Sequence, residues 1–80
     1  GITPALKMIA LARQLDLKVM AGCMTESTIG ISNLGQLAPL LDYLDADGAM
    51  LLNKDIATGV SFKNGSILYA DGFGSGAQLK

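Results

Sequence analysis

Two apolar segments with helical spacing alternate with two short strand-like runs, and this order limits the folds open to the chain. Helices are expected over residues 4–15 and 29–41, where apolar side chains recur at helical intervals. Strands are expected over residues 18–21, buried on both faces, and over residues 43–45. Helices and strands that alternate through short links are typical of an α/β fold with a parallel sheet.

Local signals predict where the two helices begin and end. Thr3 suits an N-cap, and Pro4 suits the first helical position, where no N–H is needed. Ser27 or Thr28 can cap the second helix. Pro39 falls late in that helix, so we expect the helix to end or bend just before it.

The pattern changes to β structure in the last third of the chain. Residues 60–63 alternate as a half-buried strand, and residues 66–69 are the expected return strand. Asn64-Gly65 between them is the strongest short hairpin signal, a type I′ turn. The glycine-rich residues 71–76 are expected to form an extended tail rather than a phosphate loop, which needs a following helix.

Composition excludes several classes of function. The chain has 80 residues, of which 50% are hydrophobic and 16% charged, so we expect part of something larger or a homo-oligomer. Net charge is −1 with scattered basic residues, which argues against nucleic acid, and no apolar run is long enough for a membrane span. The single Cys23 favours a reducing, cytoplasmic setting. Histidine is absent, which removes histidine-activated nucleophiles and the commonest zinc ligand.

Two carboxylates, Asp45 and Asp47, stand two residues apart at the end of the second predicted strand. If the strand continues through them, both side chains point to one face. Like charges this close are unfavourable unless a cation lies between them. That cation could be a metal ion, a lysine or arginine, or the ammonium group of a ligand. The alternative is a polar turn, in which Gly48 supplies an unusual backbone angle.

The loop after the first strand is the second candidate region. Ligands of parallel α/β sheets bind at the carboxyl ends of the strands, so this loop and Asp45 should lie side by side on one rim. Glu26 in the loop either contacts a ligand or favours the start of the following helix by its charge. Cys23 is expected to be a small apolar filler rather than a nucleophile.

Four stretches of the chain, residues 1–7, 22–27, 45–52 and 59–76, resemble the C-terminal part of dipeptide epimerases of the enolase superfamily, relatives of muconate cycloisomerase. The resemblance implies a modified TIM (β/α) barrel with an α+β capping domain. Residues 1–52 would then be the end of the barrel, with its seventh and eighth strands. Residues 53–80 would be a C-terminal hairpin and tail that return to the capping domain.

The same resemblance implies a Mg²⁺-dependent isomerase that inverts the α-carbon of the C-terminal residue of a dipeptide through an enolate. Asp45 and Asp47 would hold the substrate's ammonium group, and Met24 and Glu26 would also contact the substrate. The catalytic lysines and the metal ligands would lie before residue 1. The chain itself would then have no catalytic and no metal-binding residues.

Two alternatives remain open. A muconate-type cycloisomerase or an o-succinylbenzoate synthase belongs to the same superfamily, but neither substrate carries the ammonium group that the paired carboxylates require. The isolated chain could instead be a non-catalytic, self-associating α/β fragment, because two barrel strands leave unpaired edges. A monodisperse monomer with cooperative unfolding would contradict that hypothesis.

Overall fold

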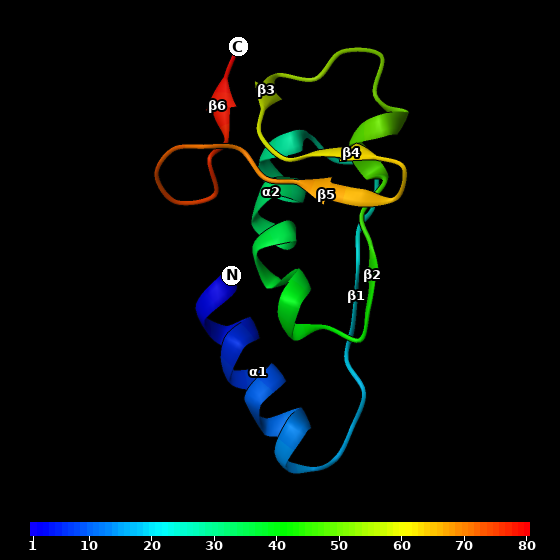
Figure 1. The fold of residues 1–80 in the computed structure, drawn as a ribbon, viewed down its shortest axis with the longest axis vertical. Helices are drawn as coiled ribbons and strands as arrows, with labels where there is room; N and C mark the ends of the chain where they lie inside the picture. The colour runs from blue at the N-terminus through cyan, green and yellow to red at the C-terminus, as the bar shows by residue number, and fades with distance from the viewer.

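The computed structural model describes residues 1–80 and shows two helices packed beside a short two-stranded sheet, with a hairpin lying across one end (Figure 1). The elements of the first two thirds are α1 (Ile2–Gln14), β1 (Met20–Gly22), α2 (Thr28–Leu37), a 3₁₀ turn (Ala38–Leu40), β2 (Tyr43–Asp45) and a second 3₁₀ turn (Gly48–Leu51). The predicted alternation of helix and strand is therefore confirmed.

The strands β1 and β2 pair in parallel, as the sequence predicts. Met20 lies opposite Tyr43, and Gly22 lies opposite Asp45. Both strands therefore end at the same edge of the sheet. The two polar loops that follow them begin side by side.

The helix ends agree only in part with the local signals. Helix α1 begins at Ile2 with Gly1 as its N-cap, so the prediction of Thr3 as N-cap is wrong. The Ala5 N–H already bonds the Gly1 carbonyl oxygen at 3.2 Å, and Pro4 is tolerated because it lies within the first turn. Helix α2 has Ser27 as its N-cap and ends before Pro39, as predicted.

The last third contains four short strands, β3 (Ala57–Thr58), β4 (Ser61–Lys63), β5 (Ser66–Leu68) and β6 (Gln78–Leu79). Asn64 and Gly65 have φ of 51° and 79°, so the predicted turn and hairpin are confirmed. The prediction of an extended tail is wrong. Gly72, Gly74 and Gly76 all have positive φ, and these turns bring β6 back to pair antiparallel with β3.

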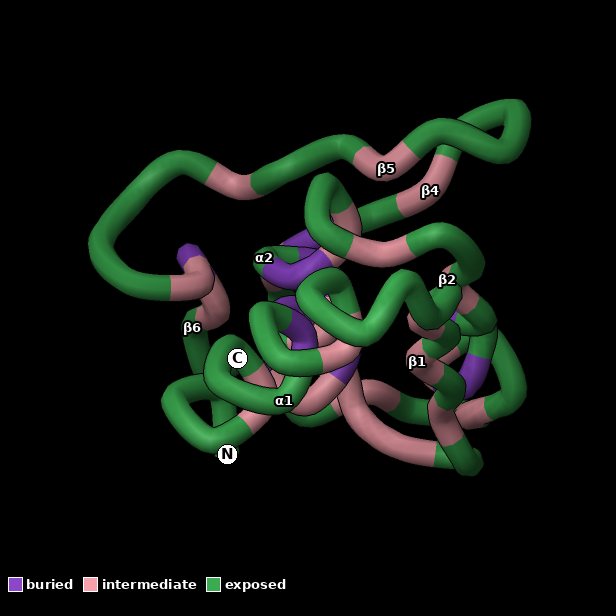
Figure 2. The backbone as a smooth tube through the Cα atoms, turned by 90° about the horizontal axis from the view of Figure 1, so that it is seen from below, coloured by how far each residue is buried: buried purple, intermediate pink, exposed green.

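The core lies where α2 meets the segment after β2 and the hairpin. It consists of Ile31, Ala46 and Val60, and Figure 2 shows buried backbone concentrated on α2. The fully buried Ser32 hydroxyl accepts the Val60 N–H at 3.0 Å, and the Tyr69 hydroxyl donates to the α2 backbone. These contacts attach the hairpin to α2 and hold it beside the end of β2.

The sheet is covered on one face only, so the expectation that β1 is buried on both faces is wrong. Met20 is 65% exposed and Tyr43 is 57% exposed. A second buried face requires another packed layer, which these 80 residues do not form. Neither helix combines the length and apolar character needed to cross a bilayer.

A carboxylate from a distant loop binds the first residue of α2. Asp55 accepts the Thr28 N–H at 3.1 and 3.0 Å with its two oxygens, and it also accepts the Thr28 hydroxyl and, at 3.2 Å, the Ala57 N–H. These hydrogen bonds, led by that of the Thr28 hydroxyl, lower the pKa of Asp55 against the opposing effect of its desolvation. The ionised form of Asp55 is therefore the one that stabilises the fold.

This depressed pKa predicts how stability changes in acid. The contribution of Asp55 is present above the unfolded-state pKa of about 4 and is lost as pH falls through the folded-state value. We expect the free energy of unfolding of the complete protein to fall more steeply between pH 5 and pH 3 than that of an Asp55→Asn variant. Urea unfolding at each pH measures this difference. Equal slopes for the two proteins would contradict the prediction.

Candidate ligand-binding site

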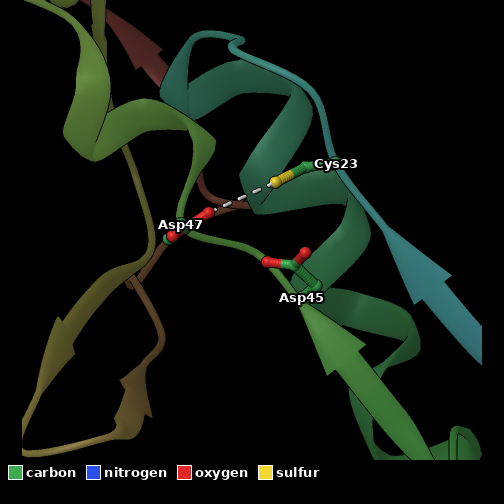
Figure 3. Close-up of side chains that lie close together, drawn as sticks. All are labelled: Cys23, Asp45 and Asp47. Atoms are coloured by element: carbon green, nitrogen blue, oxygen red, sulfur yellow. Dashed lines mark hydrogen bonds between the residues drawn. The ribbon is translucent and has the colours of Figure 1, made fainter.

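The two loops at the carboxyl edge of the sheet bring three polar side chains together (Figure 3). The Cys23 sulfur, a carboxylate oxygen of Asp45 and a carboxylate oxygen of Asp47 all lie within 4.8 Å of one another. Cys23 comes from the loop after β1, and the two carboxylates come from β2 and the segment behind it. The prediction that both loops lie beside each other on one rim is confirmed.

The backbone around the two carboxylates differs from an ideal strand. Strand β2 ends at Asp45, and Asp47 has φ of −91° and ψ of 3°, so the strand does not continue through both residues. Ala46 between them is buried in the core, whereas Asp45 and Asp47 are exposed. Burial of the small apolar residue therefore keeps both carboxylates outside the core even though the strand has ended.

Gly48 is required at this position by close packing, not by its backbone angle. It is not among the residues with positive φ, so the reason predicted for it from the sequence is wrong. A Cβ atom on Gly48 would lie 2.0 Å from the Met24 carbonyl oxygen and 3.1 Å from the Cys23 sulfur. The two loops therefore touch at a point where no side chain fits.

Cys23 makes two polar contacts that the sequence did not predict. Its half-buried sulfur accepts the Gly48 N–H at 3.2 Å, and its thiol lies 3.9 Å from Asp47 Oδ1, to which it donates. The thiol also packs against the core, which agrees with the predicted filler role. Its partners lie 24 and 25 residues away, and no local pattern signals such a contact.

The other two predicted site residues lie differently. The Glu26 carboxylate lies over Gly30 in the first turn of α2, where an added Cβ would come within 2.1 Å of its Oε2, and it is outside the group of three. Met24 is 87% exposed, and it meets the site through its carbonyl oxygen. The structure thus brings Asp45 and Asp47 together, but not Glu26.

A cavity of about 560 Å³ lies beside the carboxylates, between β2 and the hairpin β4–β5. Asp45 and Asp47 contribute its charge, and Asn64 and Gly65 of the hairpin turn also line it. The rest of the wall is apolar: Ala38, Leu44, Ala46, Met50, Phe62 and Ile67. Its volume is in the range of small-molecule sites.

The side chains around Asp45 and Asp47 limit which kind of cation could lie between the two carboxylates. The single ion pair of the chain joins Arg13 to Asp42 at 2.7 Å, so no lysine or arginine neutralises Asp45 or Asp47. Mg²⁺ prefers six oxygen ligands, and a group of two carboxylates and a soft thiol fits it poorly. An ammonium group, with three N–H donors, suits two neighbouring carboxylates.

No family model matches the chain, but individual proteins are similar to it over nearly its whole length. It is 53% identical over 79 residues to an L-Ala-D/L-amino acid epimerase of Flavobacterium johnsoniae and 55% identical over 80 residues to one of Maribacter sp.. Each alignment covers 99% of this chain and 24% of the relative. An N-acetyl-D-glutamate racemase of Pseudoalteromonas sp. is 31% identical over 90% of this chain and 21% of that protein.

The fold has a close counterpart among solved structures. A substrate-liganded complex of the L-Ala-D/L-Glu epimerase from Bacillus subtilis matches it with a TM-score of 0.83 and 27% identity. That match covers 99% of this chain and 24% of the solved chain. The chain therefore spans about a quarter of the length of the proteins it matches.

Proposed function

We propose that this chain, which is similar over nearly its whole length to dipeptide epimerases of the enolase superfamily, is the part of such an enzyme that binds the substrate's ammonium group. The observation that carries the proposal is the pair Asp45 and Asp47, whose oxygens lie within 4.8 Å of the Cys23 sulfur and of each other. No side chain of the chain neutralises them. The parent enzyme would invert the α-carbon of the C-terminal residue of a dipeptide.

The ammonium group is the right partner for this pair for two reasons. It is a compact cation whose three N–H donors can reach oxygens of both carboxylates at once. It also belongs to the N-terminal residue of the dipeptide, one peptide unit away from the carbon that changes configuration. Holding it fixes the position of that carbon without blocking the chemistry there.

In this proposal the remaining machinery belongs to the rest of the parent protein. Residues 1–52 contribute the last two strands of a TIM barrel, and residues 53–80 join the capping domain. The lysines that move the proton, and any Mg²⁺ with its ligands, lie in the parts that this chain does not include. Met24 and Glu26 belong to the loop after β1 on the same rim, where they would contact parts of the substrate away from its ammonium group.

Substrates without an ammonium group are the main competitors. The substrates of the cycloisomerase and of o-succinylbenzoate synthase lack it. N-acetylglutamate, which appears in the name of one similar protein, lacks it too. Each would leave Asp45 and Asp47 as two adjacent unneutralised carboxylates, which costs free energy. We therefore expect dipeptides with a free amino group to react with a much higher kcat/KM than N-acylated dipeptides.

The test measures epimerisation by the complete protein that carries this chain. L-Ala-L-Glu and other L-Ala dipeptides are incubated in D₂O, and exchange of the α-proton of the C-terminal residue is followed by NMR. We expect exchange and epimer formation, with kcat/KM about 100-fold lower for the N-acetylated dipeptide, as expected for loss of charge-assisted hydrogen bonds. N-acetylglutamate is the control substrate. Equal rates with free and acetylated dipeptides would reject the ammonium role.

A chimera tests the chain separately from its parent. The 79 residues of the Flavobacterium johnsoniae epimerase that align with this chain are replaced by this chain, at 53% identity. We expect the chimera to keep its preference for the free dipeptide over the acetylated one. Loss of that preference in a folded, active chimera would count against the proposal.

A further inference from the structure

Cys23 is the side chain that connects the two loops of the site. Its thiol lies 3.9 Å from Asp47 Oδ1, and its sulfur accepts the Gly48 N–H at 3.2 Å (Figure 3). Asp47 is exposed and is the N-cap residue of the 3₁₀ turn Gly48–Leu51. Its side chain accepts no hydrogen bond from the backbone of that turn. The thiol is therefore the contact that restrains this carboxylate.

We propose that Cys23 is a positioning residue that orients the Asp47 carboxylate toward the ammonium group of the substrate. This inference rests on the proposed function and adds a residue to it. The thiol engages Oδ1, which leaves the second oxygen of Asp47 available for the ligand. Cys23 acts through Asp47 and takes no part in proton transfer.

A thiol suits this role because it is uncharged. A lysine or arginine at the same place would orient Asp47 more strongly, but its charge would compete with the ammonium group of the substrate. A neutral S–H is a weak donor that orients the carboxylate and leaves both negative charges for the ligand.

The sulfur is itself held in place by the surrounding backbone. The Gly48 N–H occupies one side of the sulfur, and the Gly48 backbone packs so tightly against the Met24 carbonyl that an added Cβ would come within 2.0 Å of it. A shift of the loop after β1 therefore moves both Cys23 and the backbone next to Asp47. The two loops act as one unit.

The test uses four versions of the complete protein beside the wild type: Cys23→Val, Cys23→Ser, Asp47→Asn and the double variant Cys23→Val/Asp47→Asn. Valine fills the space of the thiol without a donor, whereas serine keeps a donor and an acceptor. We expect Cys23→Val to raise KM for the dipeptide about 5-fold, the effect of losing one ordinary hydrogen bond, because the thiol is a weak donor, with kcat nearly unchanged. Cys23→Ser should restore most of the loss.

The double variant separates positioning from a general loss of stability. If Cys23 acts through Asp47, then adding Cys23→Val to Asp47→Asn should not raise KM further. A merely structural role would raise KM equally in both backgrounds, and that result would overturn the inference. Unchanged KM in Cys23→Val with an active wild type would also overturn it while leaving the proposed function intact. An inactive wild type would reject the proposed function instead.

A chemical measurement tests the contact independently of activity. The rate of alkylation of Cys23 by iodoacetamide is followed by mass spectrometry of the peptide that contains it. A charged carboxylate accepts the thiol S–H more strongly than an amide oxygen does, so the thiol is held more tightly in the wild type and we expect alkylation to be faster in Asp47→Asn. Equal rates in the two proteins would show that the thiol and the carboxylate do not interact, and would overturn the inference.

Discussion

Replacing Asp45 or Asp47 by asparagine is expected to raise KM of the complete protein for its dipeptide by about 10- to 100-fold, with a much smaller change in kcat. Asparagine keeps the size of the side chain and one acceptor oxygen but removes the charge. The ammonium group is bound alike in the ground state and the transition state, so the loss should appear mainly in KM. Initial rates of epimerisation over a range of substrate concentrations measure both constants.

Two comparisons make this prediction specific. Asp71→Asn is the matched control, because Asp71 is exposed and belongs to the C-terminal tail away from the cavity, so KM should not change. Both site variants should also discriminate less between free and N-acetylated dipeptides. In the double variant Asp45→Asn/Asp47→Asn, KM should rise by less than the product of the two single increases, since both carboxylates bind one cation. Wild-type KM values in both Asp45→Asn and Asp47→Asn would rule out the ammonium role.

The second large effect is expected for Gly48→Ala, which should both destabilise the protein and weaken substrate binding. The added methyl group would lie 2.0 Å from the Met24 carbonyl oxygen, and a backbone atom cannot move aside as a flexible side chain can. Forcing such a contact typically costs about 1–3 kcal/mol. The two loops must separate, and Asp47 moves with them, so KM should rise as well.

Gly22→Ala is the control for this variant. Gly22 also lies at the end of a strand on the same rim, but a Cβ atom there meets nothing within 4 Å and its φ is not positive. Urea unfolding and KM should therefore be close to wild type for Gly22→Ala and clearly changed for Gly48→Ala. Similar behaviour of the two variants would mean that the close contact between the loops is not maintained in solution.

Features that depend on local sequence signals and on the order of the elements were predictable from the sequence. The helix before Pro39, the hairpin at Asn64-Gly65 and the parallel pairing of β1 with β2 all follow from local geometry and short connections. The two carboxylates at the rim were predictable for the same reason, because strand ends of a parallel sheet share an edge. The resemblance to dipeptide epimerases, confirmed by the similar relatives and fold, also rests on short contiguous motifs.

Individual side-chain contacts between distant residues were not predictable. Asp55 binds Thr28 at the start of α2, 27 residues away in the chain, and no sequence pattern indicates that these two residues are in contact. The tail was expected to be extended, but its glycines adopt positive φ and form turns that allow β6 to pair with β3. That pairing joins residues about 20 positions apart, and the glycines alone do not indicate it. Glu26 was a candidate by position alone, yet its carboxylate lies on α2.

The sequence by itself determined the order of elements and the rim on which two acids stand, because short links and alternating polarity leave few ways to fold. Only the tertiary structure decided which groups meet there. Burial of Ala46 and the close approach of Gly48 to the neighbouring loop bring the Cys23 thiol to Asp47. Such contacts arise when segments far apart in the chain pack together, and no pattern along the sequence predicts them.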